Sequence, residues 1–215
     1  MLDKKVAIQK CINMANEISK RVELSLNVYD AISKTQRELF VPVGFKHFAY
    51  KLDALPLSSA QWISSPLTVA KMTQALKIDK KVDSVLEIGC GSGYQAAILS
   101  NLVRRVFTIE RISSLLDESK SRFKELGINN IHTRCDDGQN GWRSYAPFDR
   151  ILFSAYTLSV PQKLFDQLCD GGILIAPVLI NDKQYIKRYQ KDGVQISEET
   201  LDECSFVPIE NGVIR

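Results

Sequence analysis

Hydrophobic and polar positions divide the chain into two parts with different patterns. Up to about residue 80 the pattern is helical or irregular, with Cys11, Ala15 and Ile18 at helical spacing and a short helix expected over 28–34. Farther along, short apolar runs alternate with amphipathic segments. This alternation predicts an α/β fold, namely a Rossmann-like, doubly wound and mainly parallel sheet with helices on both faces. We expect one domain, 1–215, made of an N-terminal helical extension with the substrate loop (1–80) and an α/β core (81–215).

The apolar runs of the second part predict its elements. Strands are expected at 84–88, 106–110, 130–134, 149–154 and 173–177, and helices at 94–102, 114–126 and 161–168. Antiparallel strands at 184–190 and near Phe206, with a turn at 192–193, are expected to extend the edge of the sheet. The basic stretch 183–191 is interpreted as a solvated edge strand.

A long loop separates the two parts. Residues 40–65 contain Pro42, Gly44 and Pro56 and show little periodicity. A loop of this length inside a compact domain is usually functional. Ser65 is expected to cap a helix that starts at Pro66, and Gly127 is expected to end the helix at 114–126 in the left-handed conformation, as glycine commonly does.

Composition narrows the class of protein. The 215 residues are 45% hydrophobic and 25% charged, which is typical of a globular domain and excludes intrinsic disorder. Lys and Arg number 28 against 25 Asp and Glu, and the net charge of +3 does not indicate a nucleic-acid surface. The five cysteines show no close pairs, the N-terminus is charged, and the apolar runs are short. We therefore expect a cytoplasmic monomer without membrane or nucleic-acid partners.

The sharpest chemical signal is the segment V-L-E-I-G-C-G-S-G-Y at 85–94. An apolar strand leads into Gly89, Gly91 and Gly93, and a helix follows. Glycine is needed where the backbone turns sharply or where a ligand lies against it, and the helix N-terminus offers free amide donors nearby. At the first crossover of a doubly wound sheet, this arrangement predicts a nucleotide-like ligand.

Acidic residues near the glycines favour one class of nucleotide. A dinucleotide loop needs glycine where Tyr94 stands, and the Gly-Lys-Ser/Thr of a P-loop is missing. The carboxylate of Glu87, just before the loop, suits an ammonium-bearing sulfonium better than a pyrophosphate. Glu110 ends the next strand, where it can accept hydrogen bonds from both ribose hydroxyls. The pattern favours S-adenosyl-L-methionine, with NAD(P) and a purely structural turn as the alternatives.

A third acidic position follows the third predicted strand. Asp137 could accept a hydrogen bond from an adenine amino group, and Gly138 would let the ring lie against the backbone. The alternative is an ordinary Asp-Gly turn.

Several segments together resemble the protein-L-isoaspartate O-methyltransferases, a family of class I S-adenosylmethionine-dependent methyltransferases. They are R-E-L-F-V-P, A-L-P-L, I-S-S-P, V-L-E-I-G-C-G-S-G-Y-Q-A-A-I-L-S, D-G-Q-N-G-W, A-P-F-D and F-V-P, in order between Arg37 and Pro208. The resemblance implies methyl transfer to the α-carboxylate of L-isoaspartyl residues in damaged peptides and proteins, with S-adenosyl-L-homocysteine as product. The ester then collapses to a succinimide that reopens partly to aspartate, so the implied role is protein repair.

The same resemblance implies a set of site residues. The active-site serine falls on Ser64. The cofactor residues fall on Glu87, Gly89, Cys90, Gly91, Gly93, Gln95, Glu110, Arg111, Asp137 and Gly138. The substrate residues fall on Ala60, Gln61, Trp62, Ile63 and Val178. No metal is expected. A carboxylate acceptor is ionised at neutral pH and needs no general base, which suits a chain whose two histidines stand in no metal or triad motif.

The substrate loop departs from the family's usual P-I-G-x-G-Q-T-I-S-Q-P. This chain has Ser58 and Ala60 in place of two glycines, Trp62 in place of threonine, and Leu179 where glycine is usual after the fifth strand. We expect a narrower, more aromatic substrate pocket with weak or redirected activity on standard isoaspartyl peptides. Two alternatives remain, a class I methyltransferase with another acceptor and a catalytically silent homologue that binds the cofactor.

Overall fold

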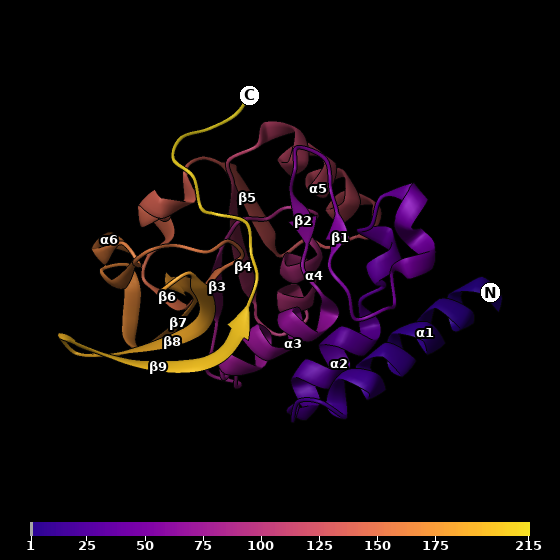
Figure 1. The fold of residues 1–215 in the computed structure, drawn as a ribbon, viewed down its shortest axis with the longest axis horizontal. Coiled ribbons are helices and arrows are strands. Elements are labelled where there is room, and N and C mark those ends of the chain that lie inside the picture. The colour runs from indigo at the N-terminus through magenta and orange to yellow at the C-terminus, as the bar shows by residue number, and fades with distance from the viewer. Residues whose placement is uncertain (1) are drawn as a thin grey trace.

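A seven-stranded sheet runs through the centre of the computed structural model, which describes residues 2–215 (Figure 1). Its strands follow the order β5-β4-β3-β6-β7-β8-β9. Their bounds are β3 (Ser84–Ile88), β4 (Arg105–Glu110), β5 (Ile131–Cys135), β6 (Phe148–Phe153), β7 (Leu168–Ile180), β8 (Lys183–Asp192) and β9 (Gln195–Cys204). The first five are mutually parallel and the last two antiparallel. The order reverses at β3, whose carboxyl end is therefore the expected ligand position.

Helices lie on both faces of this sheet, which confirms the predicted fold class. They are α1 (Leu2–Ser19), α2 (Leu26–Lys34), α3 (Pro66–Ala75), α4 (Tyr94–Ser100), α5 (Ser113–Glu125) and α6 (Gln162–Phe165), with 3-10 turns η1 (Arg37–Leu39), η2 (Val43–Phe48), η3 (Gly138–Asn140) and η4 (Arg143–Tyr145). No helix among residues 2–215 is long and apolar enough to cross a bilayer.

Each face of the sheet has its own hydrophobic cluster. Alternate residues of β3 divide between them, because side chains along a strand point to opposite sides. Val85 packs with residues of α1 to α5, whereas Leu86 and Ile88 pack with Phe107 and with Leu164 of α6. The N-terminal helices α1 and α2 lie together at one side of the molecule (Figure 1), and their buried residues belong to the same cluster as Val85.

Two predicted elements around the β6–β7 crossover are present but have other bounds than predicted. The predicted helix over 161–168 is only the four residues Gln162–Phe165, and Leu168 already begins β7. Strand β7 extends to Ile180 because β8 pairs with it along that length. A two-residue turn at Asn181 and Asp182, both with positive φ, joins the two strands.

The prediction that the basic stretch 183–191 forms the edge strand was wrong. The basic stretch 183–191 is an interior strand, and the last strand is β9, which ends before Phe206. Acidic side chains of β9 face basic ones of β8, with Lys187 Nζ 2.8 Å from a Glu198 oxygen and Arg188 paired with Glu199. These cross-strand ion pairs explain the β9 position, since its own sequence has few apolar residues.

The loop at 40–65 contains η2 and a short hairpin, formed by β1 (Leu55–Pro56) and β2 (Trp62–Ile63). Ser65 caps α3 as expected, because its hydroxyl accepts a hydrogen bond from the Thr68 amide at 3.1 Å. The hairpin, together with the capped start of α3, places Ile63 and Ser64 beside the carboxyl ends of β3, β4 and β6.

Substitution of two glycines with positive φ tests how closely the glycine loop packs on α5. Gly93 has φ +86°, and a Cβ there would lie 2.7 Å from the ring of Phe123, whereas Gly127, with φ +67°, has open space around it. We expect Gly127→Ala to lower the free energy of unfolding by about 1–2 kcal/mol through backbone strain alone. Gly93→Ala should cost about 1–3 kcal/mol more because of the clash. Urea unfolding of both variants measures the difference, and equal losses would contradict the packing.

Candidate cofactor and acceptor site

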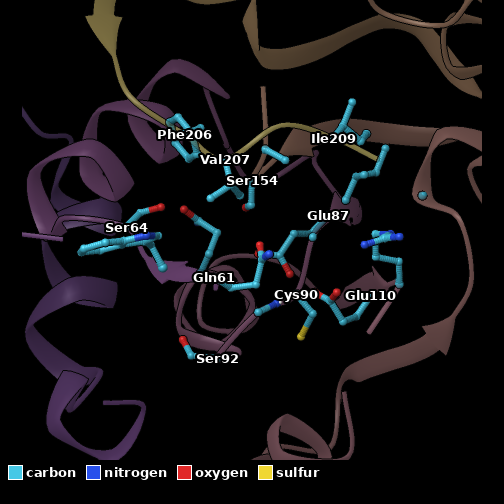
Figure 2. Close-up of a pocket in the computed structure, with 18 of the residues that line it drawn as sticks. Gln61, Ser64, Glu87, Cys90, Ser92, Glu110, Ser154, Phe206, Val207 and Ile209 are labelled. Atoms are coloured by element: carbon cyan, nitrogen blue, oxygen red, sulfur yellow. Dashed lines mark hydrogen bonds between the residues drawn. The ribbon is translucent and has the colours of Figure 1, made fainter. Parts of the chain in front are cut away.

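A cleft of about 980 Å³, including space open to solvent, lies at the carboxyl ends of β3, β4 and β6. Its wall includes the glycine loop, the β2 end of the hairpin with Ser64, the end of β4 and the residues after it, the residues that follow β6, Gly138, parts of α3 and α4, and the C-terminal segment 206–210. Figure 2 shows Ser64 and Glu110 on opposite sides of this cleft, with Ser154 and Glu87 between them.

The glycine loop and Glu110 are joined by backbone hydrogen bonds. Gly89, Gly91 and Gly93 all have positive φ, the conformation that favours glycine. The Gly91 amide donates to one carboxylate oxygen of Glu110 at 2.8 Å, and the Ile112 amide donates to the other at 3.0 Å. Each oxygen therefore keeps the capacity to accept a further hydrogen bond, and the carboxylate faces the glycine loop, as the sequence-based assignment to the ribose requires.

Glu87 is completely buried below the loop, and only one of its oxygens has a partner. The Thr108 hydroxyl donates to Oε2 at 2.5 Å, while Oε1 has no hydrogen-bond partner. Burial raises the pKa of Glu87 to about 8, with a further contribution from the negative charge of Glu110. A buried oxygen without a donor is costly, so the cleft is suited to a ligand that brings a positively charged donor.

The far end of the cleft is shaped by Gly138 and Arg111. A Cβ on Gly138 would lie 2.4 Å from Ile88 Cγ2, so this wall has no room for a side chain. Arg111 pairs with Glu210 at 2.8 Å and donates to the Gly212 carbonyl at 3.1 Å. The close packing of Gly138 on Ile88 and the contacts of Arg111 with Glu210 and Gly212 therefore fix the shape of this end of the cleft.

Most predicted residues line the cleft, but some do not. Those in its wall are Gln61, Trp62, Ile63, Ser64, Glu87, Gly89, Cys90, Gly91, Gln95, Glu110, Arg111 and Gly138. Ala60 is exposed at the hairpin tip, Gly93 packs under Phe123, and Val178 is buried beside Thr157. Asp137 also lies outside the wall, because its two oxygens accept from the Gln139 and Gly212 amides, each at 3.0 Å.

Comparison with known proteins gives consistent matches. Residues 9–213 match the profile of the protein-L-isoaspartate(D-aspartate) O-methyltransferase (PCMT) family. The chain belongs to this family. A relative from Helicobacter pylori (strain P12), a protein-L-isoaspartate O-methyltransferase, is 56% identical over 201 residues, which cover 93% of this chain and 96% of the relative.

Solved structures agree with the fold. A protein-L-isoaspartate O-methyltransferase structure superposes with a TM-score of 0.84 at 25% identity, covering 94% of this chain and 66% of the longer one. A family protein from Plasmodium falciparum, solved with S-adenosyl-L-homocysteine, gives a TM-score of 0.82 at 19% identity and covers 93% and 98%. Family membership confirms the predicted enzyme class, an S-adenosylmethionine-dependent methyltransferase acting on isoaspartyl residues in protein repair.

The C-terminal segment and the residues that follow β6 are parts of this methyltransferase site that the sequence-based prediction missed. Phe206, Val207 and Ile209 run along one rim of the cleft (Figure 2). They are held there by Tyr156, whose amide donates to the Val207 carbonyl at 2.9 Å and whose carbonyl accepts from the Ile209 amide at 2.7 Å. The F-V-P motif was a signal, but it indicated only the family and not a wall of the cleft.

The raised pKa of Glu87 predicts proton-linked ligand binding. An ammonium group favours the carboxylate form, so the affinity for S-adenosyl-L-homocysteine should rise between pH 6 and 8, by up to about tenfold per pH unit. Glu87→Gln should remove this dependence and weaken binding at pH 8, while the exposed Glu203→Gln should change neither. Titration calorimetry at three pH values measures both effects, and a pH-independent affinity in the unmodified protein would contradict the role of Glu87.

Proposed function

We propose that Ser64 holds the acceptor α-carboxylate of an L-isoaspartyl residue while Glu87, Glu110 and the glycine loop hold the methyl donor. The observation that carries this assignment is a cleft with Ser64 on one side, Glu110 bound to the glycine loop on the other, and the buried Glu87 with its unpartnered Oε1 between them (Figure 2). The methyl ester formed there collapses to a succinimide after release.

The donor side is assigned by matching charge and hydrogen-bonding capacity. When bound, S-adenosylmethionine supplies a methyl group already activated by a positively charged sulfur. The free Oε1 of Glu87 is placed to accept from the ammonium group, and the Glu110 oxygens are placed to accept from ribose hydroxyls. Gly138, which packs directly on Ile88, lines the part of the cleft assigned to the adenine ring. Asp137 acts indirectly in this assignment, by accepting a hydrogen bond from Gly212, two residues beyond the C-terminal segment.

The acceptor side requires orientation more than activation. A carboxylate with an ordinary pKa near 4 is ionised at neutral pH, so the chain need not remove a proton from it. A hydroxyl that donates to one acceptor oxygen fixes the direction of the other toward the methyl group, and such placement can lower a barrier by several kcal/mol. Neither His47 nor His132 is part of the cleft wall.

Trp62 is assigned to substrate selection. It is 55% exposed on β2, and Ile63 is buried, so strand alternation puts Trp62 on the same side as Ser64. An exposed indole beside the acceptor position would pack on an apolar residue that flanks the isoaspartate. Action as a cytoplasmic monomer on peptide or protein substrates, without nucleic acid, stays a prediction.

Ser64→Ala tests the acceptor assignment. Loss of one hydrogen bond to a charged acceptor should lower kcat/KM for an isoaspartyl peptide by about 10- to 100-fold, with unchanged affinity for S-adenosyl-L-homocysteine. Ser65→Ala is the matched control, because it removes the α3 cap and costs about 1 kcal/mol of stability but leaves methylation intact. Methanol release from the labile ester measures activity. Full activity in Ser64→Ala would contradict the assignment.

Trp62→Thr tests the substrate preference. The unmodified enzyme should favour a peptide with leucine next to the isoaspartate over one with serine, and the substitution should reduce this ratio by about fivefold or more. Trp142→Phe is the control, because Trp142 belongs to an aromatic cluster with Phe107 and Tyr145 outside the cleft wall. Equal rates on both peptides before substitution would rule out a selective role for Trp62.

A further inference from the structure

Arg37 is a fully buried cation whose guanidinium donates to backbone carbonyls. Nη1 donates to Ala49 at 2.8 Å and Lys51 at 3.4 Å, and Nη2 donates to Asp53 at 3.0 Å and Ser64 at 3.1 Å. The side chain is 0% exposed. Four acceptors from two separate segments therefore converge on one side chain, and none of them is a carboxylate.

Burying a cation costs free energy, because the charge loses its hydration. Burial lowers the pKa of Arg37 to about 10, partly offset by Tyr94 and Asp53, so the group stays charged at neutral pH. An apolar side chain of similar volume usually stabilises an interior at least as well as a buried charge does. The arrangement therefore points to a role in which the direction of the hydrogen bonds matters.

The four carbonyls lie at the two ends of the β1–β2 hairpin. Three precede β1, and the fourth, from Ser64, directly follows β2. Leu55 and Ile63 anchor the hairpin in the core. Its ladder adds little to this, because it has two residue pairs and one of them contains Pro56, which has no N–H. At its tip, Ser59 and Ala60 have φ +56° and +55°, which strains residues other than glycine.

The guanidinium also contacts the donor side of the cleft. It lies over the ring of Tyr94 at 5.7 Å from the ring centroid. Tyr94 is the first residue of α4 and directly follows the glycine loop. The Arg37 side chain thus contacts both the backbone that carries Ser64 and the helix α4, which follows the glycine loop.

We propose that Arg37 is a positioning residue that sets the place of Ser64 relative to the glycine loop. It acts through the hairpin ends and does not touch the substrate. Lysine cannot replace it, since a single ammonium lacks the planar fork that reaches both ends at once. The inference rests on the acceptor role assigned to Ser64.

Arg37→Lys is the central test, with Arg150→Lys as the matched control. Like Arg37, Arg150 donates to backbone carbonyls, those of Leu76 at 2.6 Å and Lys77 at 3.2 Å. It is only half-buried, and it lies outside the cleft wall. We expect Arg37→Lys to lower kcat for an isoaspartyl peptide by about tenfold or more, with S-adenosyl-L-homocysteine affinity changed less than about twofold. Arg150→Lys should lower the Tm without lowering kcat.

A readout independent of activity separates this inference from the proposed function. Hydrogen exchange of the 55–64 amides should speed up by about tenfold or more in Arg37→Lys, while exchange in the 89–94 loop stays unchanged. If Ser64→Ala is fully active, the proposed function fails, but the exchange result still decides whether Arg37 holds the hairpin. Unchanged hairpin exchange, or a loss of cofactor affinity in parallel with kcat, overturns the inference.

A rescue experiment covers the case in which the substituted protein is unstable. Replacing Ser59 with Asn and Ala60 with Gly supplies the residues that a type I′ turn favours and strengthens the hairpin from its tip. The combined R37K/S59N/A60G protein should recover part of the lost kcat and the lost exchange protection. Recovery of Tm without either of them would show that Arg37 stabilises the core but does not position Ser64.

Discussion

Parallel pairing of β3 with β4 is the constraint on which the site depends. Their register places Glu87 opposite Thr108, and the Gly89 amide bonds to the Ile109 carbonyl at 2.8 Å. The same register brings the end of β4 to the glycine loop, so that Glu110 can bind the Gly91 amide. A slip of one residue would turn Glu87 to the other face of the sheet and leave the cleft without its buried acid.

The buried carboxyl group of Glu87 links function to stability. Folding raises its pKa from 4.5 to about 8, so the folded state binds the proton more tightly than the unfolded state. The contribution of this group to stability is therefore complete below about pH 4.5 and is lost as pH rises toward 8. A ligand ammonium group that pairs with the carboxylate reverses this loss, because it binds only the folded state.

Local patterns predicted the parts of the fold that depend on local physics. The apolar run of β3, the glycine loop, the Ser65 cap and the left-handed Gly127 all follow from strand periodicity and backbone sterics, and the structure confirms each. The last strand was predicted near Phe206 but is β9, Gln195–Cys204, because partners on β8 determine its position and its acidic sequence has little apolar signal. The contact between Asp137 and the Gly212 amide was likewise not predictable from local sequence, because the two residues are 75 positions apart.

The two sides of the cleft differ in how they are built. The donor side uses residues at strand ends and a glycine loop, where buried ladders on either side hold the geometry. The acceptor side uses a two-pair hairpin with a strained tip, whose ends are joined through Arg37. Substitutions at the tip can then change shape and selectivity without disturbing the sheet, because few contacts depend on them. Three of the four departures from the family pattern noted in the sequence, Ser58, Ala60 and Trp62, fall in the hairpin, as this division predicts, whereas the fourth, Leu179, lies on β7.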